Sequence, residues 1–98
     1  MTYRIAFNHD QVPTPSQPVT QATDMIWNEQ DFVLYIDHLL AFDRGALRRA
    51  FRYRITHFGQ PEHLGEIMNG EGEVAYEQAR EAGVEKMNEA IARYEATH

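Results

Sequence analysis

The sequence predicts one compact, mainly helical domain of the α+β class, with three to four helices and a short N-terminal β-strand or hairpin. Three observations lead to this prediction. Apolar residues recur at helical spacing over most of the chain, residues typical of helix ends separate these stretches, and glutamates repeat at every fourth position near the C-terminus. The length of 98 residues is enough for one hydrophobic core. We therefore expect a strand and a proline-rich connector over residues 1–22 and a helical core over residues 23–98.

The N-terminal segment has the pattern of a half-buried strand, because Tyr3, Ile5 and Phe7 alternate with smaller or more polar residues. Three prolines within residues 12–18 then predict an extended connector. A lone strand is not stable, so this strand needs a partner. The candidates are the stretch near residue 12, Val19–Ala22, and the same strand of a second subunit.

The rest of the chain is predicted to form four helices. Asn28 and Asp43 are suitable N-caps for the first two, because their side-chain oxygens can accept hydrogen bonds from the amides of a first turn. Gly59 stands where a left-handed C-cap ends the second helix, and Pro61 prevents its continuation. The predicted helices run from Thr23 or Asn28 to about Phe42, from Arg44 to Phe58, from Pro61 to Met68 and from Gly72 to Ala96.

The last predicted helix carries a row of like charges at four-residue intervals. Its members are Glu73, Glu77, Glu81, Glu85 and Glu89, here called the glutamate ladder. Like charges four residues apart repel on a helix, so the row needs an explanation. It is either a solvated face, an acidic face that binds a protein, or a mimic of nucleic acid. Four residues of helix rise about 6 Å, close to the roughly 6.8 Å between every second phosphate of one DNA strand.

A cluster of arginines repeats the same interval earlier in the chain, at Arg44, Arg48 and Arg52, with Arg49 on its flank. These arginines are alternative phosphate-binding residues, as in the second helix of a helix-turn-helix motif. The acidic remainder of the chain opposes the approach of nucleic acid. The prediction that we favour is charge pairing with the glutamate ladder, within one chain or across a dimer.

Composition narrows the classes of function. The net charge of −6 disfavours general affinity for nucleic acid and favours attraction to basic surfaces. The absence of cysteine excludes disulfides and thiolate chemistry. The chain also lacks the apolar run of a membrane span or a signal peptide, so we expect a cytoplasmic protein without membrane contact.

We expect no catalytic residues, no cofactor and no bound metal. His57, His63 and Glu66 are of residue types that bind metals, but Gly59 and Pro61 interrupt the chain between the two histidines.

The predicted function is that of a small acidic, non-enzymatic interaction protein. Its partner is expected to be a protein with a basic surface, and the glutamate ladder is expected to bind it. A stoichiometric inhibitor or accessory factor of a nucleic-acid-handling protein, of the kind made by phages and mobile elements, fits this description. The alternative is a nucleic-acid-binding regulator that uses the arginine cluster. Self-association as a homodimer, through the last helix or the unpaired strand, is also expected.

Overall fold

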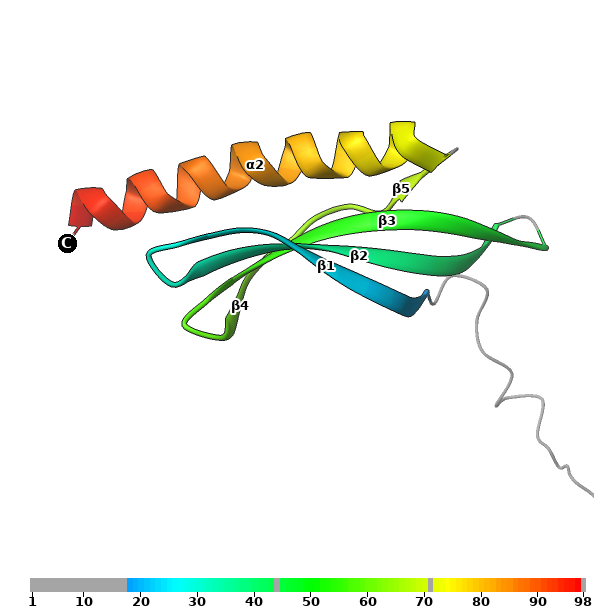
Figure 1. Cartoon of the computed structure of the whole chain (residues 1–98), viewed down its shortest axis with the longest axis horizontal. Coiled ribbons are helices and arrows are strands. Elements are labelled where there is room, and N and C mark those ends of the chain that lie inside the picture. The colour runs from blue at the N-terminus through cyan, green and yellow to red at the C-terminus, as the bar shows by residue number, and fades with distance from the viewer. Residues whose placement is uncertain (1–17, 44, 71, 98) are drawn as a thin grey trace, which may run out of the picture.

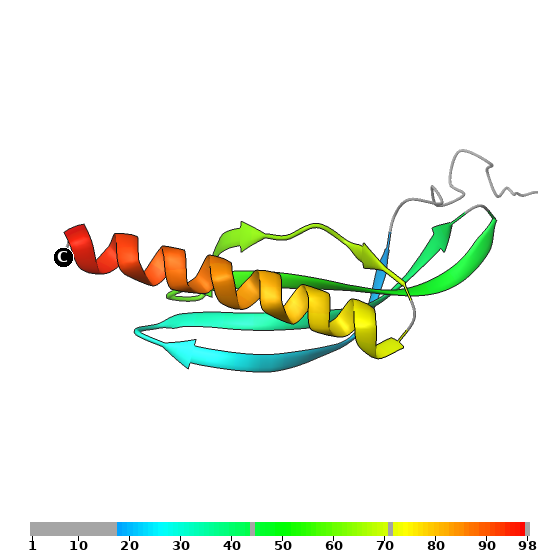
Figure 2. The same cartoon turned by 90° about the horizontal axis from the view of Figure 1, so that it is seen from above.

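The computed structural model describes residues 18–43, 45–70 and 72–97, and in these ranges the chain forms an antiparallel sheet covered by one long helix. The elements are β1 (Val19–Glu29), β2 (Phe32–Asp43), β3 (Ala46–His57), β4 (Gln60–Leu64), β5 (Met68–Asn69) and α2 (Gly72–Thr97). The strands lie in the order β1-β2-β3-β4, and β5 pairs with β3. The helix α2 runs along one face of the sheet, so the fold has two layers (Figures 1 and 2).

The predicted mainly helical domain of three to four helices is therefore wrong. The first three predicted helices are strands: the first lies over β1 and β2, the second over β3, and the third over β4 and β5. The reason is that residues four apart share a face both on a helix and on a strand. Phe32 and Ile36 on β2, like Phe51 and Ile55 on β3, satisfy either period. The residues halfway between them, Leu34 and Tyr53, are also buried, which is the strand period of two.

The residues taken for helix ends lie in or beside hairpin turns: Gly59 is in the turn after β3, Asp43 ends β2, and Asn28 and Pro61 belong to β1 and β4. Gln30 and Asp31 join β1 to β2 with φ angles of 54° and 67°, and Phe58 and Gly59 join β3 to β4 with φ angles of 52° and 79°. Two successive residues with positive φ are typical of the type I′ turn, which fits the twist of a two-stranded hairpin. The amide of Phe58 donates to the carbonyl of Asp31 over 3.0 Å and holds the two turns together.

The predicted helix from Gly72 to Ala96 is confirmed, since α2 covers Gly72–Thr97. Its buried side is made mostly of small residues: Ala75, Ala79, Gly83, Met87, Ala90 and Ile91. Small side chains allow the helix axis to approach the sheet closely.

The core lies between α2 and the sheet in two adjoining clusters. One contains Leu34 and Tyr53 of the sheet with Met87 of α2, and the other contains Ile36 and Phe51 with the alanines of the first helical turns. Gly83 marks the closest approach, because a β-carbon there would lie 2.7 Å from Leu34 Cδ1 and 3.0 Å from Tyr53 Cβ.

A second glycine, in the segment between β4 and β5, lies against the ring of Tyr53. A β-carbon at Gly65 would run into this ring, and the Gly65 amide donates to the Tyr53 carbonyl over 3.0 Å. Tyr53 is only 4% exposed. Its position is thus fixed by two places where no larger residue fits.

Two predictions about the N-terminal part lie outside the described residues: the strand at Tyr3–Phe7 and the connector up to residue 17. The stretch Val19–Ala22, considered as a partner for that strand, is the start of β1.

We predict that Gly83→Val lowers the free energy of unfolding by about 1–3 kcal/mol, because the added methyl groups must push α2 away from Leu34 and Tyr53. Urea unfolding followed by circular dichroism measures this change. Asn88→Val is the matched control, because it places the same β-branched residue at an exposed position of α2 and should change stability by no more than about 0.5 kcal/mol. A loss at position 83 no larger than that at position 88 would show that contact with Leu34 and Tyr53 does not limit the side chain at position 83.

Candidate functional site

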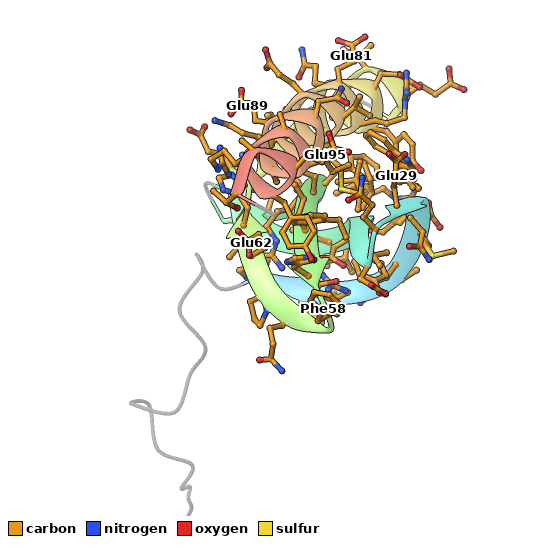
Figure 3. All side chains as sticks on the ribbon, turned by 90° about the vertical axis from the view of Figure 1, so that its left-hand side faces the viewer. Glu29, Phe58, Glu62, Glu81, Glu89 and Glu95 are labelled. Carbon is orange, nitrogen blue, oxygen red and sulfur yellow. The ribbon has the colours of Figure 1, made fainter. Side chains whose placement is uncertain are left out.

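The side of α2 that faces away from the sheet carries the glutamate ladder. All five side chains are exposed: Glu73, Glu77, Glu81, Glu85 and Glu89. Figure 3 shows Glu81 and Glu89 on the outer side of the helix. Arg80 Nη2 lies 2.7 Å from Glu77 Oε1, and Lys86 Nζ lies 3.5 Å from Glu89 Oε1. Among the described residues, the other three ladder glutamates form no salt bridge, although the charge of Glu81 acts on Arg80.

The ladder turns slowly around α2, because four residues advance about 400° and each step is displaced by roughly 40°. Its C-terminal members therefore come nearer to the sheet edge formed by β3 and β4. Burial raises the pKa of the Tyr53 hydroxyl above its ordinary value of 10.0, and the charges of Glu66, Glu89 and Glu85 raise it further.

The arginine cluster does not form one surface. Arg48, Arg49 and Arg52 lie on β3, where successive side chains point to opposite faces of the sheet. Arg49 shares the face of Phe51, which packs on α2, while Arg48 and Arg52 lie on the face away from α2, here called the far face. Arg44, the fourth predicted phosphate-binding residue, lies outside the described residues.

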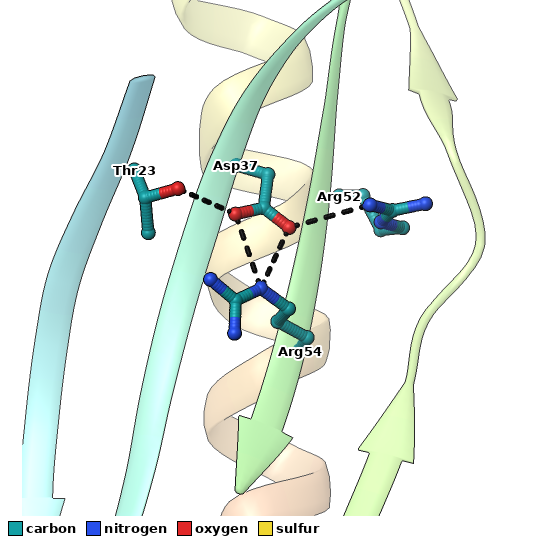
Figure 4. A network of polar contacts seen from close by, with 4 residues as sticks. All are labelled: Thr23, Asp37, Arg52 and Arg54. Atoms are coloured by element: carbon teal, nitrogen blue, oxygen red, sulfur yellow. Dashed lines mark hydrogen bonds and ion pairs between the residues drawn. The ribbon is translucent and has the colours of Figure 1, made fainter. Parts of the chain in front are cut away.

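On the far face, two arginines of β3 enclose a buried carboxylate (Figure 4). Asp37 of β2 is 1% exposed. Arg54 Nε donates to both of its carboxylate oxygens, over 3.1 and 2.9 Å, and Arg52 Nη2 donates to one of them over 3.4 Å. The hydroxyl of Thr23 on β1 completes the set with a donor distance of 2.8 Å. This network joins β1, β2 and β3 through one side chain.

The network keeps Asp37 ionised. Burial by itself raises the pKa of its carboxyl, but the hydrogen bond from Arg54 and the bond from Thr23 act in the opposite direction. The positive charge of Arg54 and the bond from Arg52 add to them, so the pKa lies below its ordinary value of 3.8. Burying an unpaired carboxylate here would cost free energy, and the hydrogen bonds from these donors offset that cost.

Pairing of Arg52 with the glutamate ladder inside one chain is ruled out by this arrangement, because the sheet lies between them and Arg52 binds Asp37. Pairing across a dimer stays a prediction. The fold thus places acidic residues on the outside of α2 and arginines on the far face of the sheet, with the protein core between them.

Sequence reasoning missed Asp37 as a structural residue. The signal was present, because Asp37 is the one acid in the run from Phe32 to Phe42, whose other residues are apolar or aromatic. A charge in such a place requires a partner. On α2's side of the sheet a second network was also missed. Asp24 Oδ2 lies 2.7 Å from His38 Nε2 and accepts from the hydroxyl of Tyr76 over 2.9 Å. The bond to His38 and the bond from Tyr76 lower the pKa of Asp24.

The histidines considered as metal ligands have other contacts. The ring of His57 stacks on Phe32 with centroids 3.6 Å apart, and the ring of His63 stacks on Tyr53 with centroids 5.4 Å apart. Within residues 18–43, 45–70 and 72–97, no group of three or more histidine, aspartate or glutamate side chains is arranged to hold a metal ion.

Comparison of the chain with models of protein families, with curated proteins and with solved structures found no match. The helix in the described part of the chain is too polar to cross a membrane. The site must therefore be judged on its own chemistry.

We predict that Asp37→Asn lowers the free energy of unfolding by about 2 kcal/mol at neutral pH, because it leaves Arg52 and Arg54 without their carboxylate. A group whose pKa is lowered by folding stabilises the protein above its unfolded pKa, near 3.8, and loses that effect as the pH falls through the folded value. The difference between the wild-type protein and the variant should therefore shrink as the pH falls below 3.8 and through the lowered pKa of folded Asp37. Urea unfolding over a pH series measures it.

The control for this series is Asp31→Asn, which removes a carboxylate from the exposed turn where Asp31 has a φ of 67°. Asparagine adopts this conformation as readily as aspartate. A loss at Asp31 as large as that at Asp37, or a difference at Asp37 that is independent of pH, would contradict the assignment of a buried ion pair.

Proposed function

We propose that the chain is a small non-enzymatic protein that binds a basic macromolecular surface through the glutamate ladder of α2. The partner that suits this surface best is a nucleic-acid-handling protein, and the chain would act on it as a stoichiometric inhibitor or accessory factor. The observation that carries the proposal is the exposure of all five ladder glutamates on one side of α2.

The supporting chemistry is a surplus of negative charge on a rigid support. Two of the five ladder carboxylates form salt bridges with cations of the same helix, and Glu81 lies near one of these cations, Arg80. Glu73, Glu81 and Glu85 form no salt bridge of their own among the described residues and are the carboxylates that we expect to meet an external partner. The helix is packed on the sheet along its buried side, so the carboxylates are presented without the cost of ordering a flexible segment. Their spacing of about 6 Å per step is near that of alternate DNA phosphates. A protein that binds phosphates with arginine and lysine therefore offers a complementary surface.

The alternative function, a regulator that binds nucleic acid through Arg44, Arg48, Arg49 and Arg52, has less support. Arg48 and Arg49 lie on opposite faces of β3, and Arg52 is engaged with Asp37. Arg48, Arg49 and Arg52 therefore present no continuous row to a phosphate backbone.

The prediction from this proposal is that Glu81→Lys combined with Glu85→Lys abolishes capture of the partner, because it reverses the charge at the centre of the ladder. The tagged wild-type chain is used to recover partners from cells of its source, and the recovered protein is purified. Its affinity for the wild-type chain and the variant is then measured by calorimetry. We expect a loss of at least about tenfold per reversed charge in contact with the partner.

The matched control is Glu62→Lys combined with Glu66→Lys, which changes the net charge equally at exposed positions outside α2. This control should retain the affinity. Recovery of nucleic acid alone, or an equal loss of affinity in both variants, would refute binding through the ladder.

A further inference from the structure

A surface pocket of about 240 Å³ lies on the sheet beyond the start of α2. Figures 1 and 2 show that the hairpin of β2 and β3 extends past this end of the helix, so the face that α2 covers elsewhere is uncovered here. The register pairs Leu40 with Arg49 and His38 with Phe51, which places these four side chains on that same face. The first turns of α2 form the adjacent wall, since the ring of Tyr76 lies 5.6 Å from that of His38.

Three polar side chains reach this pocket from three neighbouring strands: Gln21 from β1, His38 from β2 and Arg49 from β3. Gln21 stands at an irregularity of β1, where the register with β2 shifts between Thr20 and Ala22. A bulge of this kind redirects a side chain relative to a regular strand, and bulges are frequent beside binding sites.

The charges of the pocket favour an anion. Arg49 is exposed and has no anionic partner among the described residues. Asp24, an acid on the same face, directs its carboxylate to His38 and to the Tyr76 hydroxyl and not to Arg49. The bond between Asp24 and His38 Nε2 also fixes the imidazole ring and leaves Nδ1 as its second polar atom.

We propose that this pocket binds a small organic anion, with its carboxylate or phosphate group on Arg49 and its apolar part against Leu40 and Phe51. The planar guanidinium of arginine matches both kinds of oxyanion with two parallel hydrogen bonds. The pocket is smaller than those that enclose drug-sized ligands, which limits the ligand to about the size of one ring or a short chain. The pocket lies on the sheet and not on the outer side of α2, so this proposal and the proposed function succeed or fail independently.

The experiment is a titration of the full chain followed by two-dimensional ¹H–¹⁵N NMR, with benzoate, phenyl phosphate and uncharged benzyl alcohol as probes. We expect saturable shifts of the amides of Gln21, His38 and Arg49 with at least one of the two anions. The better of the two identifies the preferred oxyanion. Benzyl alcohol should bind at least tenfold more weakly, because it lacks the charge that pairs with Arg49.

Two variants with the same change of net charge make the test specific. Arg49→Gln should weaken anion binding at least tenfold, whereas Arg48→Gln, at the next residue but on the far face, should change it less than twofold. The proposal is overturned if neither anion gives saturable shifts at the pocket. It is also overturned if benzyl alcohol binds as tightly, or if the two variants lose affinity equally.

Discussion

The close contact between α2 and the sheet is the constraint on which the rest of the structure depends. Gly83 has no room for a β-carbon against Leu34 and Tyr53, and the same ring of Tyr53 leaves none at Gly65. A single sheet has no core of its own, so it needs this helix to bury its apolar face. Because the contact uses alanine and glycine, the axis of α2 lies near the strands and its large charged side chains are left to the outside.

That packing also decides where charge accumulates. One side of α2 is committed to the core, and the glutamate ladder occupies the remainder. On the far face of the sheet, Asp37 gathers Thr23, Arg52 and Arg54 from both neighbouring strands. The two charged regions thus lie on opposite sides of the fold. The ladder lies on the helix that covers one face of the sheet, and the arginines that bind Asp37 lie on the other face.

The helix was predictable and the sheet was not, for a reason that lies in the residues. The segment of α2 is rich in alanine and glutamate, both good helix formers. Its buried residues Met87, Ala90 and Ile91 are spaced by three and four positions, which fits a helix and not a strand. On β2 and β3 the buried apolar residues are spaced by two and also by four positions, so part of the pattern fits a helix as well as a strand. Gly59, in the turn after β3, also suits a helix end. The exposure of the ladder could be predicted once the helix was predicted. The partners of Asp37 could not be predicted, because the register of the strands determines which residues of β3 lie beside it.

The order of the strands in the sheet has a consequence for how the chain reaches this structure. Each of the first three strands pairs with the next one along the chain through a two-residue turn, so most of the sheet forms from local contacts and at low cost in loop entropy. The helix comes last in this sequence of elements. During synthesis, the hairpins can therefore assemble while their apolar face is still exposed, and the core closes only when α2 docks. The folding step most open to aggregation, or to capture by a chaperone, is the interval between these two events.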